Sequence, residues 1–427
     1  MRHAPRSSAL WLVAALAAPS LGLAASGQYE QMPIHSDERH LLATADDLEG
    51  YFNAHALLCK DEQALALVRR VGNSIRPQPT DDYMVYEFYV LRDPSPNAFA
   101  LPNGSVFVHT GMLARLNDED QLAALLAHEV THVAGHHTLV DHRASKKATI
   151  AGMVLSGASV WGGVIAVGLQ TSVFGFSREL EQEADDHAAI TLRDSRYDPH
   201  ALPELLDILG RDYDGLDPRV PTIWSTHPEI RARADTSRAH VASMPRRAHT
   251  AVGFEDAVYA LRAMTVQDYI RDDYPQTAVA LAEDLVARHP DDARMAQLLG
   301  DAWQGMGAQR RLDPDELTKS DRKQARKDHR KTHEQRLADQ LATDEGRAAY
   351  AENLGHAEDA YRHALTLAPT FQPAHRGLGE VYEQQKRPAN AATEYLTYVR
   401  AAPDAEDRSI VVGRLKSLTV KLKETTQ

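Results

Sequence analysis

The clearest chemistry in the chain is carried by one run, His128-Glu129-Val130-Thr131-His132. Residues four apart lie on one face of a helix, so the imidazoles of His128 and His132 can reach one metal ion. Glu129 lies beside them, where its carboxylate can polarise a water molecule. The run indicates a zinc hydrolase. A five-residue pattern also arises by chance, so its surroundings must supply the remaining ligand.

The residues around this run predict a helix. Asn117 is expected to cap it, three acidic residues fill its first turn, and apolar residues then recur with helical spacing. A longer metal-binding pattern would place a third histidine at position 138, which is Thr138. His136 and His137 are therefore interpreted as solvated residues or as neighbours of the ligands. The third ligand must come from another segment.

An acidic segment over residues 177–189 offers that ligand. Glu181 and Asp185 are four residues apart and share one helical face, while Ala184 and Ala188 are small enough for close packing against another helix. A glutamate as third zinc ligand, with an aspartate that orients a histidine ligand, is a recurrent arrangement. The alternative is a solvated acidic helix, because the carboxylates of this segment could simply face water.

Upstream, residues 97–111 predict a β-hairpin, since a Pro-Asn-Gly turn at residues 102–104 separates two apolar runs. If the first arm is an edge strand, Asn97, Ala98 and Phe99 would hold the substrate as an added strand through main-chain hydrogen bonds. The alternative is an ordinary core hairpin.

The length and charge of the chain set limits on its class. Its 427 residues are enough for two or three domains, and its net charge is −13. This charge argues against a protein that binds nucleic acid electrostatically. The single cysteine, Cys59, excludes an intramolecular disulfide and is expected to be a small buried hydrophobe.

Residues 1–26 have the three parts of a secretory signal: Arg2 and Arg6, an apolar run, and then small residues. The apolar run is short for a membrane span, so cleavage is predicted, with a retained N-terminal anchor as the alternative. Such a signal in a chain with one cysteine predicts a periplasmic protein of a Gram-negative bacterium.

Residues 148–177 contain no charged residue and are long enough to cross a bilayer. Their six glycines and several serines oppose a span, and crossing would separate Glu181 from His128. We therefore interpret the stretch as two short apolar helices that pack over the site or touch a membrane or a client protein.

The polar stretch 235–250 is expected to link two domains, and from about residue 252 the pattern is helical and partly repeated. The repeated residues are Ala357, Tyr361 and Pro369 and, 34 positions later, Ala391, Tyr395 and Pro403. That spacing is typical of a tetratricopeptide helix pair, which would present a concave surface to peptides or proteins. A charged insertion over about 310–340 interrupts the array and is expected to be a solvated helical extension.

With these motifs together, the chain resembles the M48 family of zinc metallopeptidases, most closely its periplasmic members that carry tetratricopeptide repeats and assist β-barrel assembly. The resemblance covers nearly the whole chain after the signal and rests on HEVTH, on SRELEQEAD at 177–185 and on the STHP loop at 225–228. It implies that His128, His132 and Glu181 hold one Zn²⁺, that Glu129 is the catalytic base, and that Asp185 supports a ligand.

The STHP loop adds an implied switch. In the resembled members its histidine, here His227, fills the fourth position of the zinc and keeps the enzyme latent. A catalytic zinc needs an open or exchangeable position, so His227 would have to leave before hydrolysis.

The sequence thus predicts a mainly α-helical α+β fold, with a zincin-type domain that includes a small β-sheet over residues 27–248 and an α-solenoid over 249–427. The predicted function is a periplasmic zinc endopeptidase with a chaperone-like role in outer-membrane protein assembly and quality control. Implied partners are unfolded or misassembled outer-membrane proteins and the β-barrel assembly machinery, with peripheral membrane contact left open and no nucleic acid. The alternative is a mainly non-proteolytic chaperone or scaffold that binds such proteins through its repeats.

Overall fold

The structure is a computed structural model that describes residues 34–77, 84–145, 176–215, 227, 229–248, 253–307 and 333–425. The predicted signal lies outside these residues, as do most of the apolar stretch 148–177 and of the insertion 310–340. Within the described ranges, no helix combines the length and apolar character that a bilayer span requires.

In the described part of the chain, three strands form one sheet, with β3 (Ser105–His109) at its centre. β1 (Glu87–Leu91) pairs with β3 in parallel, and β2 (Ala98–Ala100) pairs with β3 in antiparallel fashion. The order β1-β3-β2 places β2 at an edge of the sheet. The first arm of the predicted hairpin is therefore an edge strand.

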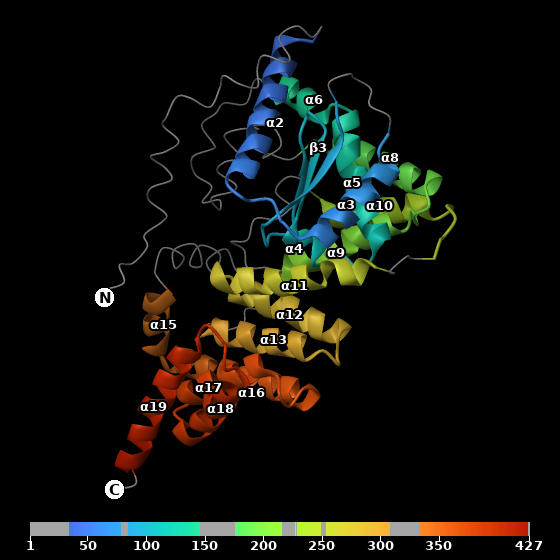
Figure 1. Ribbon diagram of the computed structural model, residues 1–427. Coiled ribbons are helices and arrows are strands. Elements are labelled where there is room, and N and C mark those ends of the chain that lie inside the picture. The colour runs from blue at the N-terminus through green and yellow to red at the C-terminus, as the bar shows by residue number, and fades with distance from the viewer. Residues whose placement is uncertain are drawn as a thin grey trace.

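Helices cover both faces of this sheet (Figure 1). Val106 and Val108 belong to a core shared with α3 (Glu62–Ile75) and α5 (Glu119–Ala134). Phe107 points the other way and meets Phe52 of α2 (Ser36–Ala54), with ring centroids 5.1 Å apart. Burial on both faces explains why the strand is an unbroken apolar run rather than an alternating one.

The turn between β2 and β3 depends on Gly104. This residue has a φ of +104°, and a Cβ there would lie 2.3 Å from the carbonyl oxygen of Val85. Asn103 needs no such freedom, because its Oδ1 accepts from the Ser105 amide at 3.2 Å and its Nδ2 donates to Asp46 at 2.9 Å. One glycine is therefore sufficient in this turn.

The rest of the N-terminal part is helical, and α8 (Arg178–Asp194) packs along α5. Ala184 and Ala188 of α8 are fully buried, as their size predicted. The additional helices are α4 (Thr110–Leu113), α6 (His137–Ser145), α8 (Arg178–Asp194), α9 (Ala201–Gly215) and α10 (Ile230–Val241).

The predicted linker at 235–250 is wrong over its first half. Residues 235–241 complete α10, which buries Ile230, Arg233, Ala234, Ser237 and Val241. These positions are spaced three or four apart, so one face of the helix packs on the core although its sequence is mostly polar.

The C-terminal part is a series of helices that pack against one another, as Figure 1 shows below the sheet. They are α11 (Phe254–Arg271), α12 (Pro275–Arg288), α13 (Ala293–Met306), α15 (His333–Leu341), α16 (Asp344–Leu367), α17 (Gln372–Gln384), α18 (Pro388–Ala401) and α19 (Arg408–Thr425). A small sheet among so many helices confirms the predicted mainly α-helical α+β class. Whether the helices form tetratricopeptide units stays a prediction.

Helix α11 joins the two parts. Its first half, including Phe254 and Leu261, lies in the core of the N-terminal part. The buried Arg262 donates to the carbonyl oxygen of Leu116 at 2.8 Å and to that of Ala114 at 3.3 Å. Arg92 also reaches across to Asp268 at 3.2 Å. These contacts fix the orientation of α11, and with it the start of the helical array.

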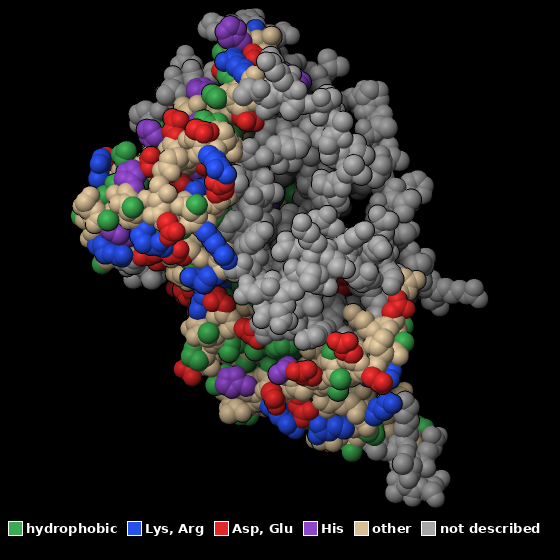
Figure 2. All heavy atoms as spheres, turned by 180° about the vertical axis from the view of Figure 1, so that it is seen from behind, with side chains coloured by type: hydrophobic (Ala, Val, Ile, Leu, Met, Phe, Trp, Pro, Cys, Tyr) green, Lys and Arg blue, Asp and Glu red, His purple; other side chains and the backbone are tan. Residues whose placement is uncertain are grey.

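The surface charge is mixed in sign where it is described. Figure 2, which views the molecule from behind, shows acidic and basic side chains interspersed over the described part of this face.

Replacing Gly104 by alanine is expected to lower the free energy of unfolding by about 1–3 kcal/mol, because the new methyl group meets backbone in a strained conformation. Urea denaturation of the full chain measures this. Gly50→Ala in α2 is the control, since no atom lies within 4 Å of its added Cβ. That control is expected to be neutral or stabilising by up to about 1 kcal/mol, so equal losses in both variants would contradict the assignment.

Candidate metal centre

Four buried side chains from three segments converge on one point. They are His128 and His132 of α5, Glu181 of α8 and His227, which precedes α10; one donor atom from each lies within 4.8 Å of the others. The sequence motifs that carry them are up to about a hundred residues apart. The structure therefore brings together all four residues that were predicted to surround a metal ion.

Helix α5 is positioned by an aspartate cap. Asp118 Oδ1 accepts from the amide of Gln121 at 2.9 Å, so the cap is Asp118 and the predicted cap, Asn117, is one residue early. Glu119, in the first turn, is buried and pairs with Arg70 and Arg196. A carboxylate at this end of a helix interacts favourably with the helix dipole, and Glu119 also anchors α5 to its neighbours.

The donor separations fit one tetrahedral cation. Four donors at the usual zinc distances of about 2.0–2.1 Å would lie about 3.3–3.4 Å apart. His128 Nε2 lies 3.1 Å from His132 Nε2 and 3.3 Å from His227 Nδ1. His132 Nε2 lies 3.6 Å from Glu181 Oε1, which is 2.8 Å from His227 Nδ1. Three ring nitrogens and a carboxylate oxygen at this spacing can hold a divalent metal.

Protonation in the cluster also suits a ligand set. Burial and the neighbouring histidines lower the pKa of His132, which favours the neutral imidazole that binds metal. Burial alone would raise the pKa of Glu181, but His227, His128 and Arg233 bring it below its ordinary value. Glu181 is therefore a carboxylate in the folded protein.

Two partners hold these ligands in place. His128 Nδ1 lies 3.0 Å from Asp185 Oδ1, so Asp185 occupies the predicted orienting position. Arg233 of α10 donates to both oxygens of Asp185 at 2.8 Å and also pairs with Glu181. Burial would raise the pKa of Asp185, but these hydrogen bonds hold it well below its usual range.

Arg233 was missed in the sequence. It lies six residues after His227, between the STHP loop and the polar stretch that begins at residue 235, and the chain around it contains many other arginines. The signal that could have identified it was the helical spacing of Ile230, Ala234 and Val241, which places Arg233 on the buried face of α10.

His132 has neighbours of its own. Its Nδ1 lies 2.8 Å from Nδ1 of His137, which is 1% exposed. The ring of Phe176 stacks on the His132 ring with centroids 4.0 Å apart and planes at 14°. Phe176 is at the end of the apolar stretch 148–177, so this end of the stretch does reach the cluster. Burial lowers the pKa of His137 despite the nearby Glu183, which favours its neutral form.

Glu129 is buried beside the cluster with one free oxygen. Its Oε1 accepts no hydrogen bond from the described residues and lies 3.8 Å from His227 Nε2. Burial raises the pKa of Glu129, although His227 and His128 oppose the rise. A carboxylate with an unused oxygen and a raised pKa has the properties of a proton acceptor.

The three predicted substrate residues divide into two kinds. The backbone carbonyl of Asn97 accepts from the amide of His109 of β3, and the amide of Leu101 donates to the carbonyl of Ser105. Between them, Phe99 is the residue of β2 whose backbone faces β3, opposite Phe107. Ala98 and Ala100 alternate with it and turn their peptide groups toward the open edge. The Phe99 side chain stacks on Phe107, with centroids 5.1 Å apart, in the core between the sheet and α2. Ala98 is fully buried and its amide donates to Oδ1 of Asn97 at 3.0 Å, so the partly exposed Ala100, rather than Ala98 or the Phe99 side chain, offers peptide groups at this edge.

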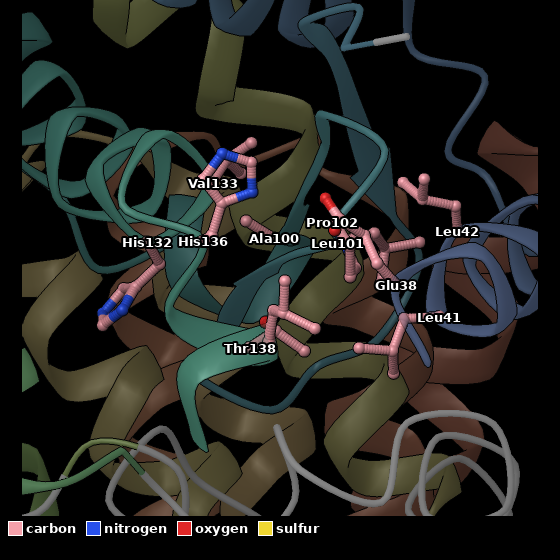
Figure 3. Close-up of a pocket in the computed structure, with 11 residues that line it drawn as sticks. Glu38, Leu41, Leu42, Ala100, Leu101, Pro102, His132, Val133, His136 and Thr138 are labelled. Atoms are coloured by element: carbon pink, nitrogen blue, oxygen red, sulfur yellow. The ribbon is translucent and has the colours of Figure 1, made fainter. Parts of the chain in front are cut away.

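A narrow pocket lies beside the carboxyl end of β2. Figure 3 shows Leu41 and Leu42 of α2 facing Leu101 and Pro102, whereas the ring of His132 turns away from these side chains. The remaining lining residues are Glu38, Ala100, Val133, His136, Thr138 and Leu139. A mostly apolar pocket thus adjoins both the edge strand and the metal-binding helix.

Comparison with known proteins agrees with this geometry. Residues 62–240 match the model of Peptidase family M48. The mitochondrial metalloendopeptidase OMA1 of Schizosaccharomyces pombe is 35% identical over 153 residues, which cover 35% of this chain and 44% of that protein. The β-barrel assembly-enhancing protease of Escherichia coli strain K12 is 31% identical over 165 residues, 36% of this chain and 34% of that protein.

A shorter relative, the metalloprotease YcaL of Escherichia coli strain K12, is 29% identical over 187 residues, 42% of this chain and 68% of that protein. The chain spans less than half the length of OMA1 and of the β-barrel assembly-enhancing protease. The family match includes HEVTH, the acidic helix and His227, which are the segments that form the buried cluster. Residues 62–240 of the chain are therefore a metallopeptidase domain of family M48.

Proposed function

We propose that the protein is a zinc-dependent endopeptidase. The observation that carries this proposal is the buried cluster of His128, His132 and Glu181 with the free Glu129 carboxylate beside it. Two histidines and one carboxylate are a ligand set that catalytic zinc uses in peptidases, and imidazole nitrogen suits zinc better than magnesium or calcium. A zinc ion in this site would acidify water and polarise a carbonyl group.

Glu129 would act as the general base. Its unpaired Oε1 can take a proton from the attacking water and pass it to the amine that leaves when the peptide bond breaks. Such proton transfer contributes typically about 10²–10⁴-fold to a rate.

The substrate would bind as an extended strand along β2. The outward peptide groups of Ala100 offer hydrogen bonds that depend little on substrate sequence. Unfolded segments are the substrates that can adopt this conformation.

His227 would keep the enzyme latent. Its ring lies between the ligands and the base, with Nδ1 near His128 and Glu181 and Nε2 near Glu129. This is the space that an attacking water needs. Hydrolysis would therefore require His227 to move away.

The cellular role is inferred from the relatives. The name of the β-barrel assembly-enhancing protease and the predicted secretory signal support a periplasmic enzyme that acts on unfolded or misassembled outer-membrane proteins. The C-terminal helices would bind these clients or the assembly machinery. The alternative is a scaffold whose C-terminal helices bind such proteins without proteolysis. The long helical array supports this alternative.

Glu181→Ala is expected to abolish stoichiometric zinc binding, because it removes the carboxylate of the ligand set. Metal analysis of the purified full chain measures the zinc content. Glu179→Ala, on the exposed side of the same helix, is the matched control and should retain zinc. Normal zinc in Glu181→Ala would remove Glu181 from the ligand set.

Glu129→Gln is expected to keep zinc and lose proteolysis by at least about 10²-fold, since the amide cannot accept the proton. Cleavage of an unfolded outer-membrane protein tests the rate. The same variant tests the alternative role in a deletion strain. Rescue of envelope defects by the inactive variant would favour the scaffold, and failure to rescue would favour proteolysis.

His227→Ala is expected to raise the rate of cleavage, because it frees the fourth position for water. The measurement is the initial rate of zinc-loaded variant and wild type on the same substrate. His240→Ala is the control, since that histidine pairs with Asp186 on the outside of α8. A rate equal to or below that of the wild type would show that His227 is not inhibitory.

A further inference from the structure

The contact between His132 and His137 carries a further inference, which rests on the proposed zinc site. Both rings are buried, and their Nδ1 atoms are 2.8 Å apart. This distance is that of a hydrogen bond between two ring nitrogens, so one Nδ1 carries a proton and the other does not. The metal-facing atom of His132 is Nε2, which points to His128 and Glu181.

A ligand nitrogen must be deprotonated, so a neutral His132 that binds metal through Nε2 carries its proton on Nδ1. That N–H then donates to His137 Nδ1. His137 in turn must carry its own proton on Nε2, which lies 3.8 Å from the Glu183 carboxylate on α8. One consistent set of tautomers therefore runs from the metal site through the two histidines.

The chain is shaped to place this ring. Helix α5 ends at Ala134, and His136 adopts a φ of +51° before α6 begins at His137. Gly135 has an ordinary helical backbone, but a Cβ on it would lie 2.4 Å from His137 Nε2. The absence of a side chain at Gly135 is what lets the His137 ring turn back onto His132.

We propose that His137 is a positioning residue, which accepts the Nδ1–H of His132 and thereby fixes the tautomer and the ring orientation of that zinc ligand. Asp185 holds His128 in the corresponding way, through its carboxylate. The two histidines of one helix would thus be oriented by different chemical groups, a carboxylate for the first and a neutral imidazole for the second.

The test compares two variants of equal size in the full chain. His137→Asn keeps an acceptor oxygen where Nδ1 lies, whereas His137→Leu replaces it by a methyl group. Zinc affinity is measured by competition with a chelator, without reference to activity. The Leu variant is expected to bind zinc about 10–100-fold more weakly, and the Asn variant to stay within about threefold of the wild type. Equal affinity of Leu variant and wild type, or an equal loss in both variants, would overturn the proposal.

Gly135→Ala provides a second route, because it displaces the ring while leaving His137 in the sequence. It should weaken zinc binding as His137→Leu does, and unchanged affinity would count against the proposal. If His137→Leu does not fold, the tautomer of His137 is measured directly by NMR on zinc-loaded wild type with ¹⁵N-labelled histidine. The long-range ¹H–¹⁵N spectrum must show His137 protonated on Nε2 and not on Nδ1, and the opposite tautomer would overturn the inference. A wild type that binds no zinc would instead defeat the proposed function itself.

Discussion

The buried pairing of Arg233 with Glu181 and Asp185 is the interaction on which the centre depends. Three carboxylates, those of Glu129, Glu181 and Asp185, lie buried within one small volume. Burying an uncompensated charge is expensive, and one guanidinium offsets only part of three negative charges. A divalent cation would supply the remaining two positive charges, since −3 is balanced by +1 and +2. The side chains of the centre therefore carry an excess of negative charge that a divalent metal ion would neutralise.

The same excess of negative charge explains the directions of the pKa shifts. Burial and Glu181 help to raise the pKa of Glu129, and the negative charge of Glu181 and Glu129 raises the pKa of His227 although burial lowers it. A proton on His227 can thus take part of the role that a metal would take. Glu181 contacts two basic groups at once: Oε1 faces His227, and Oε2 pairs with Arg233. The two partners, which lie six residues apart in the chain, therefore contact different oxygens of Glu181.

The helical array is attached to this centre through a polar junction inside the core. Arg262 is fully buried, and it satisfies the carbonyl oxygens at the end of α4 that no helix bond can reach. Because α11 also contributes apolar residues to the core of the sheet, the two parts share a helix rather than a flexible connection. The start of the helical array therefore has a fixed direction relative to the sheet.

Much of the site followed from local rules. Spacing of four placed His128 with His132 and Glu181 with Asp185, and a turn signal placed the hairpin, because these patterns depend on neighbours within a few residues. The sequence could not identify Arg233, Phe176 or the role of His137, and it took part of α10 for a linker. Each of these depends on which side chains become buried against segments that are distant in the sequence.

The sequence by itself determined the chemical types of the ligands, the helices that carry them and the mainly α-helical class of the fold. Only the tertiary structure decided that Arg233 pairs with Glu181 and Asp185, that β2 is an edge strand, and that Phe99 packs on Phe107 in the core beneath α2. The reason is physical: helical and strand periodicities are set by local backbone geometry, whereas burial and charge balance arise only when segments about a hundred residues apart pack together.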